Sequence, residues 1–312
     1  MRPAVLARAL RQHPRQVDFG LRRFRLRPGP ARGVLESSGR AFLTGLNASV
    51  EPDPGVLGRQ VSALEPELRG FAFEGAGMGC ALLDLLLPVR RGRVAALLNG
   101  PAADYPHLVH VGAGWAYARL RLRPSRNAGT DPLLRWLAWD GFGFHQGFFH
   151  PDRAIGRRRV EPGVGRGPRQ VRDQGLGRAL WFCECADPDG VALRIAEFPV
   201  GRQADLWSGI GLAATYAGGA DAAELARLAD LSGPFRAHLA QGCAFACAAR
   251  RVSGIVPAHT DKAAEVLAGT STGAAADWTD RALERCAPSP STLADYQRWR
   301  AEIRYLWERK NR

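Results

Sequence analysis

The stretch WDGFGFHQGFF, residues 139–149, places an acid and a histidine among aromatic side chains. The acid is Asp140 and the histidine is His145. A carboxyl or imidazole group packed against aromatic rings can acquire a shifted pKa and then transfer protons. We therefore take Asp140 and His145 as candidate catalytic residues, together with Glu74, which stands in a similar sequence context.

Glu74, Asp140 and Ser208 share one position in a repeated pattern of aromatic, oxygen-bearing, Gly, apolar, Gly and apolar residues. The pattern occurs at residues 73–78, 139–144 and 207–212. Asp and Ser are preferred at helix N-caps, whereas Glu suits that position less well. Two interpretations stay open: these side chains cap helices, or they point into a central space between the repeats.

Aromatic and imidazole side chains near these positions are the candidates for contacting a substrate. They are His110, Trp115, Trp139, Phe142, Phe144, Trp207 and His238. A space bounded by such groups would shelter an apolar ligand from water. The same residues could also be ordinary core packing.

Other chemistries fit the sequence less well. A phosphate-binding glycine loop needs a strand before the glycines, and no convincing strand precedes them here. His145 and His150 have the wrong spacing for one helical face, so we predict no metal site, and we expect no other cofactor. Gly269–Gly273 matches a nucleophile elbow around Ser271, but a helix-like segment stands where the elbow requires a buried strand. An ordinary loop is therefore favoured at Ser271.

A second pattern alternates with the first one. It reads Gly, variable, Ala, bulky and apolar, and it occurs at residues 114–118, 177–181 and 242–246. Both patterns recur with a period of about 65 residues, which is typical of one supersecondary unit used repeatedly. Small residues one helical turn apart favour close helix packing. We therefore predict an all-α fold of about three helix pairs that form a curved or closed α/α array.

The predicted domain organisation is simple. Residues 33–312 form a single helical-repeat domain, with a leading helix at 35–49 and closing helices at 274–285 and 294–309. Residues 1–32 form a basic N-terminal arm or cap. The segment 191–198 is the one stretch that would also suit a short strand.

Charge is the strongest feature of the composition. The chain of 312 residues is 46% hydrophobic and carries a net charge of +13, nearly all of its basic residues being arginine. This charge favours an acidic partner such as a carrier protein. Nucleic acid is disfavoured because no known nucleic-acid-binding motif is present. Arg119, Arg178 and Arg202 lie near the repeats and are either ion-paired surface residues or anion contacts.

The sequence also indicates a compartment. Its first residues, MRPAVLARALRQHPRQ, lack the apolar core of a secretory signal. No apolar run reaches the length of a membrane-spanning helix. We therefore expect a cytoplasmic protein without membrane insertion, whose cysteines are structural and reduced.

Several longer blocks carry a resemblance to a known family. They lie at residues 69–78, 110–116, 139–145, 173–181 and 205–212. In these blocks the sequence resembles a family of bacterial proteins of unknown function that accompany natural-product gene clusters, notably those of enediyne polyketides. The resemblance implies a role accessory to an iterative polyketide synthase, and no catalytic residue is carried over from it.

These observations lead to one leading function and two alternatives. The leading expectation is an accessory protein that binds a long polyene and isomerises or cyclises it, with Glu74, Asp140 and His145 moving protons. The first alternative is a non-catalytic adaptor that holds the polyene or docks on the synthase or its carrier protein. The second is a basic repeat protein that binds nucleic acid. A large apolar cavity with buried acids would favour the enzyme.

Overall fold

The computed structural model describes residues 9–51, 53, 55–87, 92–124, 131–286 and 289–311. All regular elements in these ranges are helices, which confirms the predicted all-α fold. The segment 191–198 falls largely within α10 (Pro188–Ala196) and is not a strand. Val191 and Ile195 explain the difference, because they lie one helical turn apart and are both buried.

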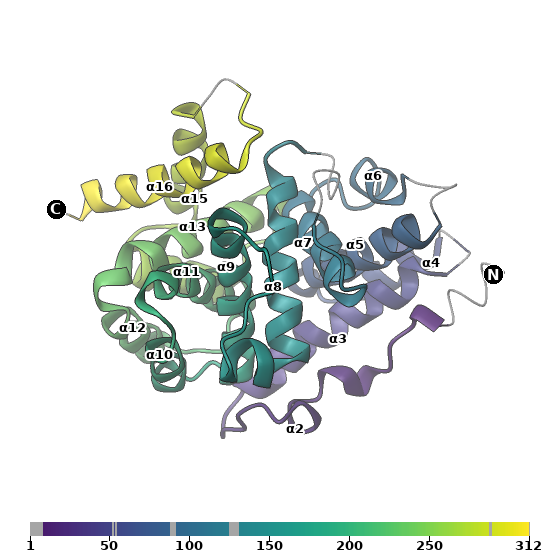
Figure 1. The fold of residues 1–312 in the computed structure, drawn as a ribbon, viewed down its shortest axis with the longest axis horizontal. Coiled ribbons are helices and arrows are strands. Elements are labelled where there is room, and N and C mark those ends of the chain that lie inside the picture. The colour runs from purple at the N-terminus through teal and green to yellow at the C-terminus, as the bar shows by residue number, and fades with distance from the viewer. Residues whose placement is uncertain are drawn as a thin grey trace.

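Long helices form an array in which each packs on the next one along the chain (Figure 1). They are α3 (Ala31–Ser49), α5 (Arg69–Leu86), α7 (Pro106–Arg119), α8 (Leu137–Phe149), α9 (Arg166–Cys183), α11 (Val200–Ala217) and α13 (Arg236–Ser253). The array folds back on itself. The ring of Phe71 in α5 lies 5.3 Å from that of Tyr216 in α11, and Arg250 of α13 donates a hydrogen bond to the backbone oxygen of Glu67.

Shorter helices connect and cover the array. They are α2 (Phe19–Arg22), α4 (Gly55–Ser62), α6 (Arg93–Leu98), α12 (Ala222–Leu231) and α14 (Ala258–Ala263). Five-residue π-helical turns, Asp152–Gly156 and Ala264–Ala268, follow α8 and α14. The predicted closing helices are present as α15 (Thr272–Glu284) and α16 (Leu293–Lys310), which pack on α13.

Glycine sets the distance between successive long helices. A Cβ atom on Gly143 of α8 would lie 1.9 Å from the backbone oxygen of Arg172 in α9, and one on Gly175 of α9 would lie 1.8 Å from that of Asp140 in α8. Backbones this close leave no space for a side chain, and their packing offsets the cost of about 1 kcal/mol for each helical glycine. Similar contacts join the other neighbouring helices through Gly45, Gly75, Gly77, Gly112, Gly114, Gly141, Gly177, Gly209, Gly211 and Gly242.

These glycine contacts bear on the predicted repeat. The segments 73–78, 139–144 and 207–212 all lie inside helices, namely α5, α8 and α11. Comparable contacts also occur on α7, α9 and α13, which lie between and after them. Glycine contacts therefore recur once per long helix, whereas the predicted period of about 65 residues covers two helices. The superposition of three helix pairs stays a prediction.

The predicted N-terminal arm is well packed over its described part. Phe19 and Phe24 are buried in the core. The backbone N–H of Arg25 donates to the oxygen of Cys183 at 2.8 Å, and that of Gln12 donates to the side chain of Asn47 at 2.8 Å. The arm therefore lies across α3 and the end of α9, while residues 1–8 lie outside the described residues.

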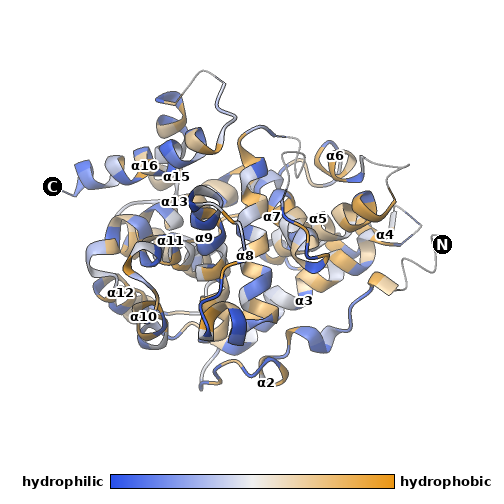
Figure 2. Cartoon of the chain, in the orientation of Figure 1, coloured by the Kyte–Doolittle hydropathy of each residue, from blue (hydrophilic) through white to orange (hydrophobic). Residues whose placement is uncertain are grey.

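Hydropathy follows this arrangement (Figure 2). Orange, apolar residues are frequent along α5 and α8 in the middle of the array, whereas the outer helix α16 is bluer. Within the described ranges, no helix combines the length and the apolar character needed to cross a membrane. All six cysteines are free thiols.

Candidate functional site

Two acids predicted to be catalytic meet one arginine inside the array. Arg178 Nη1 donates to Asp140 Oδ1 at 2.6 Å, and Arg178 Nη2 lies 3.4 Å from Glu74 Oε2. The indole N–H of Trp115 donates to Glu74 Oε1 at 3.0 Å. Glu74, Asp140 and Arg178 are all buried. Arg178 is therefore neither a surface residue nor a free anion contact.

A chain of hydrogen bonds extends from Asp140 across the molecule. Gln174 Nε2 donates to Asp140 Oδ2 at 2.8 Å, and Ser208 Oγ lies 3.1 Å from Gln174 Oε1 and 3.3 Å from Gln241 Oε1. Arg304 of α16 reaches the same oxygen of Gln241 at 3.4 Å. The chain thus links side chains from α8, α9, α11, α13 and α16.

Most members of this hydrogen-bonded chain occupy one position of the repeated pattern, the residue before a glycine. Glu74, Asp140 and Ser208 lie inside their helices and point inward, so the N-cap interpretation is wrong for them. Sequence reasoning missed Gln174 and Gln241. Both directly precede a glycine of the interhelical contacts, as do the three residues that were found. That shared position was the available signal.

Burial controls the proton affinities in this centre. Burial raises the pKa of Glu74, and the nearby Arg178 charge and the Trp115 hydrogen bond offset this only in part. Burial alone would lower the pKa of Arg178, but the charges of Asp140 and Glu74 outweigh that effect and raise it. The arrangement is a mutually satisfied ion cluster, which can fix the relative positions of α5, α8 and α9.

The spaces beside the ion cluster are small. An aromatic cavity of about 40 Å³ touches Glu74 and Arg178. Its other lining residues are Val17, Ser38, Gly39, Phe42, Leu43, Phe71, Trp115, Phe144, Phe148, Phe149 and Phe182. A second cavity, also about 40 Å³, touches Asp140, Arg178, His107 and Tyr216. Pockets for drug-sized ligands usually measure about 300–1,000 Å³, so neither cavity holds a long polyene in this conformation.

A much larger hollow lies at the surface. We call it the arginine groove, and its volume is about 620 Å³. Its lining residues are Gln12, Gln16, Arg22, Ala118, Arg119, Arg121, Leu122, Arg123, Phe142, His145, Gln146, Phe149, His150, Arg153, Glu161 and Pro162. It therefore combines several arginines with aromatic rings and the predicted residues Phe142 and His145.

Arg119, Arg121 and Arg153 give the groove its charge. All three are exposed, and none has an ion-pair partner among the residues that the structure describes. Arg22 differs, because its guanidinium stacks on the ring of Phe149 at 4.8 Å and donates to the backbone oxygen of Gln16. Exposed guanidinium groups that are not paired with an acid are suited to bind a carboxylate or a phosphate.

His145 lies in the wall of the groove with only 5% of its surface exposed. Its Nδ1 atom has no hydrogen-bond partner among the described residues. Burial, together with the charges of His150 and Arg119, lowers the pKa of His145 to about 3. The imidazole is therefore neutral at physiological pH. Asp140 lines the second cavity instead, so the structure does not bring the proposed Asp140–His145 pair to one space.

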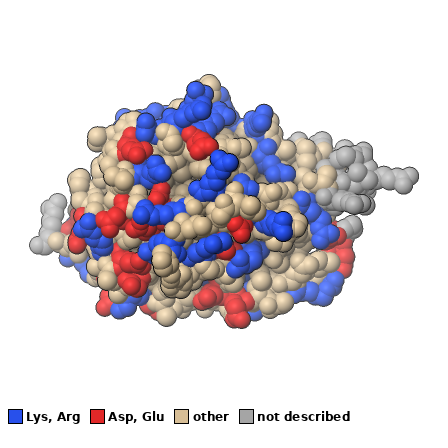
Figure 3. All heavy atoms as spheres, turned by 90° about the horizontal axis from the view of Figure 1, so that it is seen from below, with Lys and Arg blue, Asp and Glu red and all other residues tan. Residues whose placement is uncertain are grey.

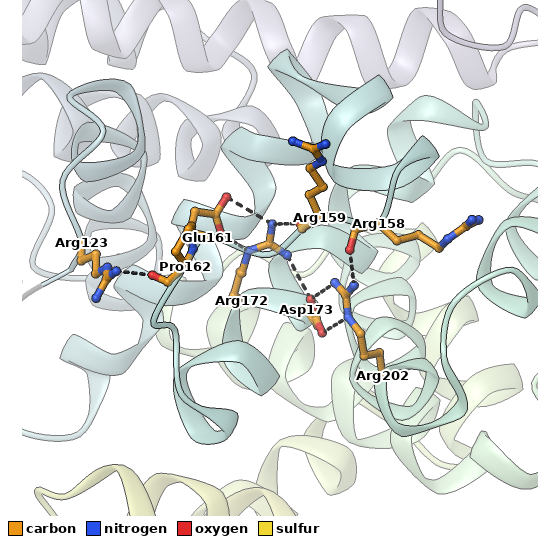
Figure 4. Close-up of polar contacts among 8 residues, drawn as sticks. All are labelled: Arg123, Arg158, Arg159, Glu161, Pro162, Arg172, Asp173 and Arg202. Atoms are coloured by element: carbon orange, nitrogen blue, oxygen red, sulfur yellow. Dashed lines mark hydrogen bonds and ion pairs between the residues drawn. The ribbon is translucent and has the colours of Figure 1, made fainter.

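The wall of the groove that contains Glu161 and Pro162 is fastened to the protein interior (Figure 4). The buried side chain of Arg172 donates to Glu161 Oε2 at 2.8 Å and to the backbone oxygen of Arg159 at 3.0 Å. Arg123 holds the same wall from the groove side, donating to the backbone oxygen of Pro162.

Arg172 is itself part of a buried ion cluster. Arg202 Nη2 donates to Asp173 Oδ1 at 2.6 Å, and Arg172 Nη1 lies 3.1 Å from the same oxygen. Arg202 Nη1 also donates to the backbone oxygen of Arg158 at 2.8 Å. This cluster therefore positions the segment between the π-helical turn and α9 that forms one side of the groove.

The remaining predicted residues are dispersed. Trp115 and Phe144 line the aromatic cavity, whereas His110, Trp139, Trp207 and His238 line neither that cavity nor the groove. His110 Nδ1 lies 2.7 Å from the oxygen of Pro106, in its own helix. Burial lowers the pKa of His238 to about 3. The predicted residues thus do not form one enclosed pocket.

The structure also shows the surroundings of Ser271, the candidate nucleophile, and of potential metal ligands. Ser271 Oγ accepts a hydrogen bond from the backbone N–H of Ala274 at 3.2 Å, as an N-cap at the start of α15. The element before Ser271 is the π-helical turn Ala264–Ala268, not the strand that a nucleophile elbow requires. Among the described residues, no group of three or more His, Cys, Asp and Glu side chains is arranged to hold a metal ion.

The charge on one face of the molecule is mixed rather than continuous. On the face shown in Figure 3, Lys and Arg side chains alternate with Asp and Glu side chains. No unbroken basic stripe crosses this face. A duplex-binding surface would present such a stripe to the phosphate backbone.

Comparison with known proteins identifies the family. The chain belongs to the family described as "Protein of unknown function (DUF1702)", whose profile matches residues 3–306. No curated protein sequence and no solved structure matches the chain.

Proposed function

We propose that this protein is a cytoplasmic binding protein for a long, unsaturated, anionic molecule, and that it serves as an accessory protein of enediyne-type polyketide biosynthesis. The observation that carries the proposal is the arginine groove, which joins unpaired arginines to aromatic rings in a space of about 620 Å³. Arg119, Arg121 and Arg153 bind the anionic head of the ligand. Phe142 and Phe149 contact its conjugated body.

The buried acids support a binding role over a catalytic one. Glu74 and Asp140 are both engaged by Arg178, and the spaces next to them measure about 40 Å³ each. A general acid or base must come within hydrogen-bond reach of the reacting atom. A long polyene does not fit beside either carboxyl group in this conformation.

A conjugated tetraene carboxylate, parinaric acid, tests the proposal, because its fluorescence rises when the chain leaves water. We expect saturable binding to the wild-type protein. The triple variant Arg119→Gln, Arg121→Gln and Arg153→Gln should weaken binding by about tenfold or more, since a hydrogen bond to a charged group contributes about 1.5–3 kcal/mol. The methyl ester of the probe should bind the wild-type protein as weakly as the acid binds the variant.

The control carries the same change of charge elsewhere. Arg281→Gln, Arg298→Gln and Arg309→Gln alter exposed arginines of α15 and α16, outside the groove. This variant should bind the probe like the wild-type protein. Equal losses in the two triple variants, or equal affinity for acid and ester, would show that net charge or bulk hydrophobicity drives binding and not the groove.

A second candidate function keeps the predicted enzyme. Glu74 has a raised pKa and touches the aromatic cavity, so it is the carboxyl group best placed to give a proton to an unsaturated ligand. Isomerase or cyclase activity would require the cavity to open. Product formation by wild-type protein and Glu74→Gln, supplied with the same polyene, separates this candidate from the binding protein, because only an enzyme loses turnover.

A further inference from the structure

Phe149 borders two spaces that otherwise share no lining residue. It lines both the arginine groove and the aromatic cavity. It is the last residue of α8 and is half-buried. The guanidinium of Arg22 lies 4.8 Å from its ring, and the ring of His145 also lies 4.8 Å away. One side chain thus separates a charged surface groove from an interior aromatic space.

The wall of the aromatic cavity is suited to hydrocarbon. Its polar members are Ser38, Glu74 and Arg178, and each is already engaged. Ser38 Oγ donates to the backbone oxygen of Val34 at 3.3 Å, while Glu74 and Arg178 bind each other. A site for water needs two to four free polar partners. The remaining wall consists mainly of aromatic rings, which offer apolar and π contacts.

We infer that the aromatic cavity is a second subsite, which takes the apolar or unsaturated end of a ligand whose anionic head lies in the arginine groove. This inference rests on the proposed function for the position of the head. Phe149 turns aside to admit the chain, which enters between Arg22 and His145. The ligand class is an amphipathic carboxylate or phosphate with a flat hydrocarbon end.

The size of the cavity limits what enters. One water molecule occupies about 30 Å³ of the liquid, so a space of about 40 Å³ takes a terminal methyl, vinyl or ethyl group. Each buried methylene raises affinity about fourfold. Occupation of the cavity by two terminal carbons should therefore raise affinity roughly 15-fold over a chain that stops in the groove.

A cavity-filling variant tests the second subsite. Val17→Phe fills the cavity from the short helical turn Pro14–Val17 and changes no residue that lines the groove. Affinities are measured for a series of unsaturated carboxylates of increasing length. In the wild-type protein we expect a sharp gain once the chain is long enough to pass Phe149. Val17→Phe should abolish that gain, which lowers the affinity for long chains roughly 15-fold, and should leave the affinity for short acids unchanged.

Val34→Phe is the matched control, because Val34 is 39% exposed and does not line the cavity. It should bind the whole series like the wild-type protein. If Val17→Phe does not fold, Leu43→Phe fills the same cavity from α3 and changes no residue that lines the groove, and the same loss for long chains is expected. An unchanged chain-length profile in a folded variant, or an equal loss for short and long acids, would overturn the inference.

Xenon separates this inference from the proposed function, because it has no head group. Xenon binding to the protein is followed by NMR with no acid present. In the wild-type protein we expect xenon to shift the signals of residues that line the aromatic cavity, and in Val17→Phe we expect those shifts to be lost, even if the carboxylates fail to bind the groove. Xenon shifts that are identical in Val17→Phe and the wild-type protein would show that the aromatic cavity does not accept apolar groups.

Discussion

Arg178 donates a hydrogen bond of 2.6 Å to Asp140 Oδ1 in the interior of the helical array. The same guanidinium also contacts Glu74, so two carboxyl groups from α5 and α8 share one cation from α9. Loss of the Asp140 charge removes the shorter of the two contacts of Arg178 and leaves its guanidinium with Glu74 alone, at 3.4 Å, in a medium of low dielectric constant. This relationship makes Asp140 a residue on which folding depends, whatever else it does.

Asp140→Asn should therefore lower the free energy of unfolding by about 3 kcal/mol, at the lower end of what breaking a buried ion pair costs. Urea unfolding measures it. Asp189→Asn is the matched control, since Asp189 pairs with Arg227 at 2.8 Å on the exposed surface, where water screens the charges. Equal stability of Asp140→Asn and the wild-type protein would contradict the structural role of the cluster.

Glu74→Gln should change how stability depends on pH. The folded protein raises the pKa of Glu74 above the ordinary value of 4.5, chiefly by burial. The contribution of Glu74 to the free energy of unfolding is therefore complete below pH 4.5, and it declines as pH rises through the raised pKa. Stability measured from pH 4 to pH 8 should show this decline in the wild-type protein and a shallower one in Glu74→Gln. Glu265→Gln, at an exposed position, controls for the amide substitution and should keep the wild-type profile.

His145 should remain neutral throughout the physiological range. Its pKa is lowered from 6.5 to about 3, first by burial and then by His150 and Arg119. Between pH 6.5 and pH 3 the unfolded chain therefore binds a proton that the folded protein does not. As the pH is lowered through that window, the free energy of unfolding decreases by up to about 1.4 kcal/mol per pH unit. His145→Gln should flatten this slope. NMR should show no titration of the His145 ring between pH 8 and pH 5, and a midpoint above pH 5 would contradict the burial.

Gly143→Ala tests the close approach of α8 and α9. The new methyl group would lie 1.9 Å from the backbone oxygen of Arg172, so the helices must separate. We expect a loss of about 3 kcal/mol, at the upper end of the cost of overpacking. Gly58→Ala in α4 is the control, since no atom lies within 4 Å of its added Cβ and alanine favours the helix. Thermal denaturation should show opposite shifts of Tm, and parallel shifts would refute the packing argument.

An acidic carrier domain should bind the protein in a salt-dependent manner if the unpaired arginines also serve a protein partner. Charges at the surface are screened over roughly 10 Å at 0.1 M salt, so affinity measured by titration calorimetry should fall as salt rises. The Arg119, Arg121 and Arg153 triple variant should bind the domain more weakly than the Arg281, Arg298 and Arg309 variant does. Tighter binding of duplex DNA than of the carrier domain would instead favour a nucleic-acid partner.

Local sequence was enough to predict the helices. Regular apolar spacing and small residues one turn apart indicated an all-α chain, and the closing helices were found near their observed bounds. The repeated glycines indicated close helix packing, because a helix tolerates several glycines only where backbones must approach. The same repeat pointed to Glu74, Asp140 and Ser208 as a set, and the structure joins all three through one hydrogen-bonded chain.

The tertiary structure decided which of these residues share a space. Side chains project from a helix around its whole circumference. Asp140 and His145 of α8 therefore line different spaces, a buried cavity and a surface groove, respectively. The groove itself combines the N-terminal segment, α7, α8 and the segment before α9. The acid in its wall, Glu161, is paired with Arg172, so Arg119, Arg121 and Arg153 are left without an ion-pair partner among the described residues. Sequence fixes the local periodicity of each helix, but pairing of charges and enclosure of space depend on contacts between helices that only the folded chain creates.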